Sequence, residues 1–482
     1  MPRNVVFVSI FDLTRVFYEM AVALTERGHR VSWITTNELW TDWLKRQGVA
    51  EHDILQLVYD RSAFVGEDEK ARLVPEIVAA EANSDLTVNQ SLIMDRFVIF
   101  KNKPDINEYM FLYYRDIKRF LQEKQADIVF AEPTNCNEMM THIVCGELSV
   151  PLVAPWDMRY PARRTIFCPG YDQATLAVAD ESTEVEPETG HQLIDDFAAR
   201  QERPFSFKKF NEQKIIDSRK AARVTANRLR LLHPSSRRHL THHDFSERLR
   251  NALGRIVNGF YMRHICRHDQ LDNIPGKLAF YPLHVQPESS IDVQGSFFSD
   301  QLKLIKDIRR SLPFDMTLVI KEHPNFLGQR GPSFFRQLRR IPNVKLVPYS
   351  MSTFDIYRRT AIVFTVTGTA AYEAGLLGIP AVTFAPMYFG GFSTIRHCGD
   401  VTRLKEVVFD LIQDRRRDRA NDDRFMAQLM MQSHEGYWTD PLFDPAVMAD
   451  ENIQCLQKAF VRIVESQWVG KKGQDSKTAE HR

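Results

Sequence analysis

Cysteine is scarce in this sequence, and no two cysteines lie close together. The 482 residues include six, which are spread along the chain as Cys136, Cys145, Cys168, Cys266, Cys398 and Cys455. Zinc sites and disulfide frameworks are recognised by closely spaced cysteines, so this spacing argues against both. Scattered cysteines are typical of proteins from a reducing compartment, and we therefore expect the protein in the cytoplasm.

Long hydrophobic runs and net charge are also lacking. No apolar run reaches the roughly 18 residues expected of a membrane span, and the N-terminus reads as a core strand without a cleavable signal pattern. The formal net charge is only +1, so global charge gives no reason to expect nucleic acid as a partner. A content of 44% hydrophobic and 26% charged residues is typical of a globular protein with two or three domains at this length.

The most informative motif follows the apolar run 316–320, which reads as a buried strand. Lys321, Glu322 and His323 emerge together from its end, and Pro324 prevents the strand from continuing. Ligands of open α/β sheets bind beyond the carboxyl ends of strands, and a lysine with an imidazole suits a phosphorylated ligand. The alternative interpretation is a solvated strand end followed by a turn.

Two further strands also run into polar or small residues. The first leads into the loop within 280–289, and the second, 362–366, enters the turn Thr367-Gly368-Thr369 and then a helix that Gly378 ends. Backbone N–H groups at a helix N-terminus attract a phosphate, and Gly368 allows its close approach. Glu373, in about the first turn of this helix, is expected to accept hydrogen bonds from ribose hydroxyls; the alternative is a partner of the helix dipole.

Taken together, these motifs resemble a known family. The order His-x-Gln-Pro-Glu, Lys-Glu-His-Pro and Thr-Gly-Thr-x-x-x-Glu-Ala-x-x-x-Gly-x-Pro is similar to the capsule polysaccharide biosynthesis family, which includes the transferases of 3-deoxy-manno-octulosonic acid (Kdo) in bacterial capsule export systems. The resemblance covers about 276–395, with weaker similarity at 130–134 and 155–167. It implies a glycosyltransferase of the GT-B type, with two facing Rossmann-like domains and a nucleotide-activated, CMP-linked sugar donor.

The motifs give the expected site residues of the nucleotide-binding half. Those expected to bind the nucleotide sugar are Gln286, Glu288, Lys321, His323, Pro324, Thr367, Gly368, Thr369 and Glu373. His284 of the first motif joins the catalytic candidates. Transfer needs positive charge and N–H dipoles to stabilise the leaving nucleotide phosphate, which Lys321, His323 and the turn at Gly368 can supply.

Strand and helix patterns alternate in two parts of the chain, which predicts an α/β fold with a parallel doubly wound sheet in each part. We expect an acceptor-side domain over 1–199, a basic helical insertion over 200–274 and a nucleotide-sugar-binding domain over 275–438. A C-terminal helix over 439–469 is expected to pack back on the first domain. The polar residues 470–482 are expected to be disordered.

The first half is expected to supply acceptor contacts and part of the chemistry. Glu132 follows a predicted strand, 127–131, and is the main candidate for a catalytic carboxylate. The alternative is that Glu132 caps the helix that starts near Asn137. Asp12, after the first strand, is the reserve candidate.

Asp157 is followed by three arginines, Arg159, Arg163 and Arg164. Their guanidinium groups suit the carboxylate of a sugar such as Kdo. The alternative is that they are ordinary surface residues.

Two absences bear on cofactors. No glycine-rich phosphate loop follows the first strand, so a dinucleotide cofactor in the first half is not expected. No Asp-x-Asp motif stands at a strand end in the second half, so a bound divalent metal is not required. The sequence leaves open whether transfer retains or inverts the anomeric configuration, although the family resemblance favours retention.

The segment 200–269 is strongly basic, with about seventeen Lys and Arg against about six Asp and Glu. Apolar residues recur at helical spacing within 245–265. The segment is either a solvated helical insertion or a surface that faces an anionic lipid head group or an anionic glycan. Nucleic acid is less expected because aromatic residues are not interleaved with the charge.

Three functional hypotheses are open at this stage. The first is a glycosyltransferase acting on a glycan or lipid-linked acceptor. The second is another enzyme on the same scaffold, either a sugar-nucleotide epimerase, which needs no acceptor, or a teichoic-acid-type glycerophosphate transferase. The third is a degenerate transferase that only binds glycan or lipid, against which the presence of His284, Glu288, His323 and Glu373 argues.

Overall fold

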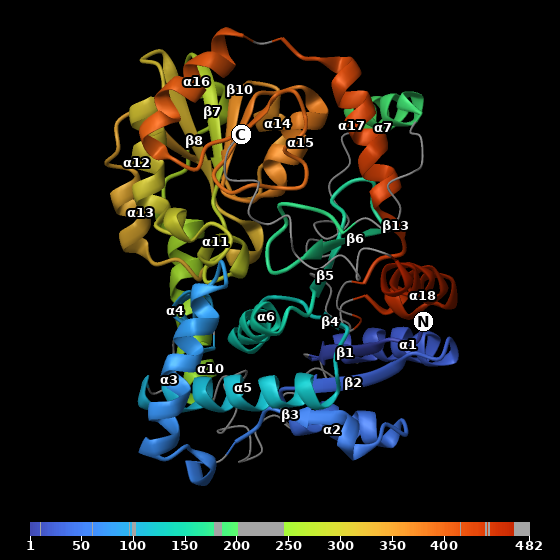
Figure 1. Ribbon diagram of the computed structural model, residues 1–482. Helices are drawn as coiled ribbons and strands as arrows, with labels where there is room; N and C mark the ends of the chain where they lie inside the picture. The colour runs from blue at the N-terminus through green and yellow to red at the C-terminus, as the bar shows by residue number, and fades with distance from the viewer. Residues whose placement is uncertain are drawn as a thin grey trace. The chain divides into compact units, whose positions relative to one another are not determined.

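The structure is a computed structural model. It describes residues 1–9, 11–59, 61–95, 97–98, 103–177, 186–200, 245–414, 416–438, 441 and 444–466. The chain divides into two compact units (Figure 1). The first comprises the described parts of Met1–Glu184 and Met430–Arg482, and the second those of Val185–Leu232 and Asp244–Leu429. Each unit has its own sheet and its own hydrophobic core.

The first unit is built on a seven-stranded sheet with the order β13-β6-β5-β4-β1-β2-β3. Its strands are β1 (Asn4–Ser9), β2 (Arg30–Thr35), β3 (Ile54–Gln56), β4 (Ile128–Phe130), β5 (Leu152–Asp157), β6 (Arg164–Pro169) and β13 (His434–Glu435). Strands β1 to β5 are parallel, whereas β6 and β13 run antiparallel to their neighbours. The sequence analysis did not predict β6 or β13.

Helices pack along the sheet of the first unit. They are α1 (Leu13–Glu26), α2 (Glu38–Arg46), α3 (Glu67–Ala82), α4 (Val88–Met94), α5 (Lys103–Glu123), α6 (Cys136–Leu148) and α18 (Asp450–Glu465). Helix α18 packs against α1. The ring of Phe460 on α18 lies 4.8 Å from that of Phe130 and 5.0 Å from that of Phe167. The predicted return of the C-terminal helix to the first half is therefore confirmed.

The second unit has a six-stranded sheet with the order β12-β11-β10-β7-β8-β9, and all of its strands are parallel. They are β7 (Lys277–Pro282), β8 (Met316–Lys321), β9 (Val344–Val347), β10 (Thr360–Thr365), β11 (Ala381–Thr383) and β12 (Ile395–His397). The strands alternate with helices, as the sequence predicts for a doubly wound fold. The predicted α/β class with two Rossmann-like parts is confirmed.

The helices of the second unit include one that lies before the basic segment. They are α7 (Pro187–Arg200), α10 (Phe245–Phe260), α11 (Ser289–Asp292), α12 (Gln301–Ser311), α13 (Pro332–Leu338), α14 (Thr353–Tyr357), α15 (Thr369–Leu377), α16 (Leu404–Gln413) and α17 (Arg419–Gln432), whose last residues pass into the first unit. Helix α7 packs against α15. It therefore belongs with the second unit, whereas the sequence analysis placed it at the end of the first domain.

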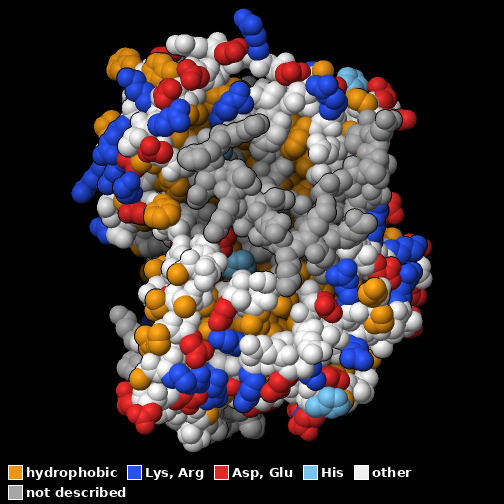
Figure 2. Space-filling model, in the orientation of Figure 1, with side chains coloured by type: hydrophobic (Ala, Val, Ile, Leu, Met, Phe, Trp, Pro, Cys, Tyr) orange, Lys and Arg blue, Asp and Glu red, His pale blue; other side chains and the backbone are white. Residues whose placement is uncertain are grey.

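Several expectations fall partly or wholly outside the described residues. Residues 201–244 of the basic segment and the tail 470–482 are not described. None of the described helices is long and apolar enough to cross a membrane. Figure 2 shows basic and acidic side chains side by side over the described surface of one face, in keeping with the small net charge.

Candidate functional site

Three neighbouring strands bring the predicted motifs of the second unit to one edge of its sheet. Strand β7 lies between β10 and β8, and all three run in the same direction. Pro282 at the end of β7 pairs with Lys321 at the end of β8. The loops after β7, β8 and β10 therefore begin at the same edge, which is where parallel sheets place their ligands.

His284 links the loop after β7 to the end of β10. Its backbone N–H donates to Gln301 over 2.8 Å, and its Nε2 accepts from the Val366 backbone N–H over 3.1 Å. The Thr365 hydroxyl lies 3.0 Å from the same Nε2. Burial, with the nearby positive charges of His323 and Arg330, lowers the pKa of His284 to about 3. The imidazole is therefore neutral, and with Nε2 accepting, its proton lies on Nδ1.

The hydrogen bonds of the His284 imidazole matter for the catalytic role predicted for this residue, because they occupy its accepting nitrogen. The side chain is 9% exposed, and the nitrogen that a general base would use already accepts hydrogen bonds from the turn after β10. The imidazole holds two motif loops together in this arrangement. A direct catalytic role for His284 stays a prediction.

Arg330 is a central residue of this edge that the sequence analysis missed. Its Nη2 donates to the His284 carbonyl over 2.7 Å, and its Nε lies 3.2 Å from the Glu322 carboxylate. The guanidinium also stacks near the rings of Phe326 and Phe334, at 5.0 and 4.7 Å. Arg330 thereby ties the loop after β8 to the loop after β7. Because it lies nine residues beyond the strand, no motif spacing points to it.

Glu322 is buried as the anionic partner of Arg330. Its Oε1 accepts from the His323 backbone N–H over 2.7 Å. Burial raises the pKa of Glu322, while the positive charge of Arg330 opposes the rise. Breaking a buried pair by removing one partner is strongly destabilising. The contacts with Arg330 and with the His323 backbone N–H therefore fix Glu322 at the start of the loop after β8.

The turn before α15, which contains Gly368, is tightly packed. The Gly368 backbone N–H donates to the Thr365 hydroxyl over 2.9 Å, and a Cβ at Gly368 would overlap that hydroxyl. Thr367 donates its hydroxyl hydrogen to the Ser290 carbonyl over 3.0 Å. Thr369 is the first residue of α15. Glycine is therefore required here by packing, in addition to the phosphate approach that the sequence suggests.

Glu373 lies further along α15 than the sequence analysis expected. The first turn of α15 contains no acidic residue, so the alternative of a partner for the helix dipole there is wrong. The Glu373 side chain is 7% exposed and accepts from the Tyr357 hydroxyl over 2.7 Å. Burial and this carboxylate raise the pKa of Tyr357 well above its usual value. A contact between Glu373 and a ribose stays a prediction.

The remaining donor-side candidates make contacts within the same edge. Lys321 is buried as the last residue of β8, with its Nζ 3.2 Å from the Thr353 hydroxyl. Pro324 begins a short 3-10 turn just beyond β8. Glu288 accepts from the Ser290 hydroxyl over 2.9 Å.

Gln286 anchors the loop after β7. Its side-chain amide donates to Asp292 over 2.6 Å and to the Ser299 carbonyl over 2.8 Å, and its oxygen accepts from Gln301 over 3.1 Å. Gln286, Gln301 and Arg330 are among the residues lining an open pocket of about 420 Å³. The loop of the first motif is therefore rigidly held beside a polar pocket.

In the first unit, Glu132 lies just beyond β4 and is half-buried. Helix α6 begins at Cys136, with Asn135 at its N-cap position. The Glu138 carboxylate accepts from the backbone N–H groups of Asn135, over 2.7 Å, and Thr134, over 3.2 Å. The N-cap position is therefore Asn135, three residues after Glu132, and both the catalytic role of Glu132 and its alternative role at this helix end stay predictions.

Glu138 is a second carboxyl group at this strand end that the sequence analysis did not single out. It is fully buried, and burial, with the nearby charge of Glu132, raises the pKa of Glu138 well above its usual value. One of its oxygens and both side-chain amide atoms of the buried Asn137 lack a hydrogen-bond partner within the described chain. A buried carboxyl group with a raised pKa thus lies near Glu132. Sequence alone could not reveal it, since a glutamate in a first helical turn is ordinary.

The other acceptor-side candidates have different surroundings. Asp12 is buried at the N-terminus of α1, and β1 is the neighbour of β4, so Asp12 and Glu132 follow adjacent strands. Asp157 accepts from the Trp438 backbone N–H over 3.0 Å.

The arginines after β5 differ from one another. Arg164 donates to the Ser433 hydroxyl over 2.7 Å and to the carbonyl of Met430 over 3.1 Å. It therefore fixes β6 to the end of α17, and burial lowers the pKa of Arg164. Arg163 lies over the ring of Tyr437 at 5.7 Å. Binding of a sugar carboxylate by Arg159 or Arg163 stays a prediction.

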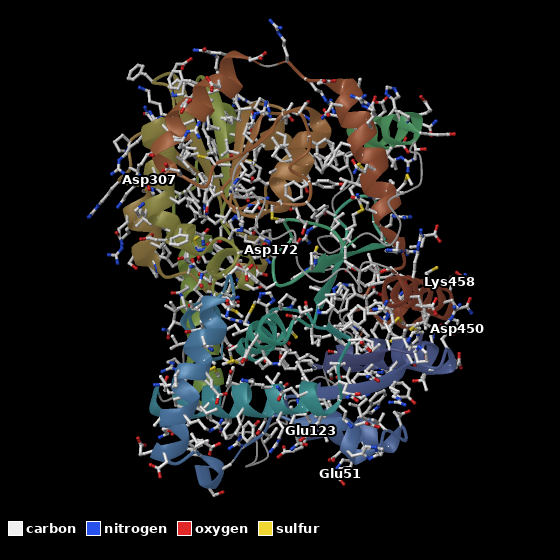
Figure 3. The ribbon with its side chains drawn as sticks, in the orientation of Figure 1. Glu51, Glu123, Asp172, Asp307, Asp450 and Lys458 are labelled. Carbon is white, nitrogen blue, oxygen red and sulfur yellow. The ribbon has the colours of Figure 1, made fainter. Side chains whose placement is uncertain are left out.

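A separate titratable cluster lies on the first unit. The His142 ring on α6 lies 3.0 Å from Asp85 and 5.1 Å from the Tyr171 ring. Asp172, labelled in Figure 3, follows in the loop after β6, and burial raises the pKa of its carboxyl group. The sequence analysis did not identify this cluster, because its members come from three distant segments.

Comparisons with known proteins give solved structures of low similarity but no matching family. No protein-family model matches the chain, and no curated protein matches it in sequence. Among similar solved structures, the β-Kdo 2,7 transferase KpsC of Thermosulfurimonas dismutans is 12% identical with a TM-score of 0.33, covering 76% of this chain and 97% of that one.

Two other structures are similar to the same extent. The UDP-GlcNAc 2-epimerase of Methanocaldococcus jannaschii, in complex with UDP-GlcNAc and UDP, is 10% identical with a TM-score of 0.28 and covers 89% of this chain and 99% of its own. HepE of Anabaena, in complex with UDP and glucose, is 11% identical with a TM-score of 0.30 and covers 89% and 94%. Similarities this low assign no activity and no ligand to this chain.

Proposed function

We propose that the protein is a glycosyltransferase of capsule or other surface polysaccharide biosynthesis. It transfers a sugar, which the motif resemblance suggests is Kdo, from a CMP-linked donor to a glycan or lipid-linked acceptor. The observation that carries this proposal is the junction of the loops after β7, β8 and β10, which His284 and Arg330 hold together. These are the three loops that contain the family motifs.

In this proposal the second unit binds the nucleotide. The phosphate lies against the N-terminus of α15, where backbone N–H groups of the first helical turn, which begins at Thr369, donate to an anion. Lys321 and His323 supply positive charge to the leaving phosphate. Glu373, positioned by the hydroxyl of Tyr357, accepts hydrogen bonds from the ribose. Gln286 and Glu288 shape the loop that encloses the nucleotide.

The first unit supplies the acceptor side of the reaction. Glu132 acts as the base that takes the acceptor proton or as the nucleophile that first attacks the sugar. Asp12 is the reserve candidate because it follows the neighbouring strand. The protein works in the cytoplasm at the inner membrane surface, where the charge of segment 200–269 attracts it to anionic lipids that accompany a lipid-linked acceptor.

Calorimetric titration of the full chain with CMP, UDP, GDP, CDP and ADP tests the donor assignment. We expect CMP to bind, and His323→Ala and Glu373→Ala each to weaken it on the order of tenfold or more. Matched controls in the same unit are His264→Ala just beyond α10 and Glu406→Ala on α16, both at exposed residues. If the two site variants bind every nucleotide as well as the parent does, the site lies elsewhere.

A second experiment distinguishes the transferase from the other enzyme class. The protein is incubated with a nucleotide sugar, with and without a glycan acceptor, and the products are followed by NMR. A transferase releases nucleotide only when the acceptor is present. Conversion of the nucleotide sugar to its epimer without an acceptor would identify an epimerase and overturn the proposal.

A further inference from the structure

Helix α10 exposes a row of large apolar side chains. They are between 51% and 68% exposed, and with about 3.6 residues per turn they fall within an arc of about 100°. We call this row the α10 stripe; it consists of Leu249, Leu253, Ile256, Val257 and Phe260. Each of the other helices in the described chain has at most two large apolar side chains that are exposed to this degree.

The stripe is not the surface by which α10 packs on its own unit. Gly328, in the loop after β8, packs directly against the backbone of α10. Its φ is +82°, and a Cβ there would overlap the carbonyl oxygen of Arg255 and lie 3.1 Å from the backbone nitrogen of Gly259. Just beyond α10, Met262 is buried in the core of the second unit. The helix therefore packs through its backbone at Arg255 and Gly259 and through Met262. These positions lie on the side of the helix away from the centre of the stripe.

The charge around the stripe has one sign. From Leu249 to Arg267 the chain contains four arginines and no Asp or Glu. Arg250 and Arg263 are both exposed and lie near the two ends of the stripe. An apolar helix face accompanied by arginines is the pattern of a helix that lies in the interface of an anionic membrane.

We propose that α10 is an interfacial helix that inserts its stripe into an anionic lipid surface. Leu249, Leu253, Ile256, Val257 and Phe260 enter the boundary between head groups and acyl chains, while Arg250 and Arg263 pair with lipid phosphates. This goes beyond the attraction of segment 200–269 to negative charge, because it adds apolar burial at a defined surface. It does not depend on which sugar reaction the protein catalyses.

Co-sedimentation of the full chain with lipid vesicles tests the proposal. The vesicles consist of phosphatidylcholine with or without phosphatidylglycerol, and each is used at low and high salt. We expect recovery with the vesicles that contain phosphatidylglycerol and weaker recovery at high salt. The variant Leu253→Ser/Ile256→Ser/Val257→Ser is expected to lower the bound fraction about tenfold or more, because burial of three large apolar side chains is lost.

A matched control removes as many exposed apolar side chains elsewhere. Val78, Ile93 and Phe314 are 56%, 64% and 93% exposed, and Val78→Ser/Ile93→Ser/Phe314→Ser is expected to bind vesicles as the parent does. Thermal melting followed by circular dichroism verifies that both triple variants are folded. The variant Arg250→Gln/Arg263→Gln is expected to weaken binding to anionic vesicles only.

Three results would overturn the proposal. The first is equal recovery of the parent with neutral and anionic vesicles. The second is equal binding by the stripe variant and its control. The third is a dimeric parent, measured by light scattering, that the stripe variant converts to a monomer, since a second copy of the chain would then cover the stripe.

Discussion

Glu132 and Glu138 are two carboxyl groups at one strand end with contrasting surroundings. Glu132 is half-buried beyond β4. Glu138 is fully buried, accepts hydrogen bonds from two backbone N–H groups of the helix cap, and has a raised pKa. Two neighbouring carboxyl groups in different environments tend to divide into one ionised and one neutral partner. Burial, with the nearby charge of Glu132, therefore favours the protonated form of Glu138.

The proposed role of Glu132 is tested by Glu132→Gln, which keeps the size of the side chain and removes its charge. We expect nucleotide affinity to stay nearly unchanged and turnover to fall on the order of 10² or more, because the base or nucleophile is lost. Steady-state kinetics and calorimetry on the same preparation provide the comparison. Transfer at close to the parent rate would pass the role to Asp12 or Asp157.

The raised pKa of Glu138 predicts a pH-dependent stability. A carboxyl group with a raised folded pKa binds more protons in the folded than in the unfolded state. Its contribution is therefore fully present below its unfolded pKa, which is about 4.3, and is lost as the pH rises toward the folded value. Glu138→Gln is neutral at every pH, so the stability of the parent should fall relative to that of the variant as the pH rises above about 4.3, the unfolded pKa of a glutamate. Chemical denaturation of both proteins at several pH values measures this, and a pH-independent difference would contradict it.

The close packing of Gly328 against the backbone of α10 predicts how two glycine substitutions change the stability of this helix. At Gly328 an alanine would be strained by the positive φ and would overlap the carbonyl oxygen of Arg255, so Gly328→Ala is expected to cost about 1–3 kcal/mol and to loosen α10. At Gly254, within α10, an added Cβ meets nothing within 4 Å. Gly254→Ala should therefore stabilise the helix by roughly 0.5–1 kcal/mol.

Hydrogen exchange of the peptide that contains α10, with chemical denaturation of both variants, tests this pair. Faster exchange is expected in Gly328→Ala and unchanged or slower exchange in Gly254→Ala. Similar exchange in the two variants would mean that the close approach of Gly328 does not hold the helix.

Elements with a strong local signal were predictable from the sequence. Apolar runs bounded by polar residues located β1, β4, β7, β8 and β10, and Gly378 ends α15 with φ +71° as a C-cap glycine should. Strands β6 and β13 were missed because they pair antiparallel at one side of the sheet, and β13 has only two residues. The pairing of β13 with β6 joins residues more than 260 positions apart, which local patterns do not encode.

The candidate site was predictable only where residues adjoin strand ends. Parallel neighbours put the loops after β7, β8 and β10 at one edge, so their motifs were expected to meet. Arg330 was missed because its link to His284 comes from packing between loops. The raised pKa of Glu138 and the hydrogen bonds of Gln286 likewise arise from burial, which single residues do not reveal.

At the scale of the whole molecule, the two ends of the chain build the same unit. Strand β1 and helix α18 belong to the first unit, and Phe460 on α18 packs on Phe7 and Phe17 as well as on the neighbouring rings of the sheet. The first unit is therefore completed only when the last helix is present, whereas the second unit is almost entirely contained within the middle of the chain. Separate cores make each unit a candidate for independent unfolding.

Scanning calorimetry of the full chain is expected to resolve two transitions, one for each unit. Phe460→Ala removes a fully buried ring from the first core and should lower one transition, at a cost of about 3–5 kcal/mol. Phe364→Ala, at an equally buried ring in the second core, should lower the other. CMP at about 100 times its dissociation constant should raise only the transition that Phe364→Ala lowers, by about 2.7 kcal/mol of binding free energy. If the two variants shift the same transition, the units unfold together, and if CMP raises the one that Phe460→Ala lowers, the nucleotide binds the first unit instead.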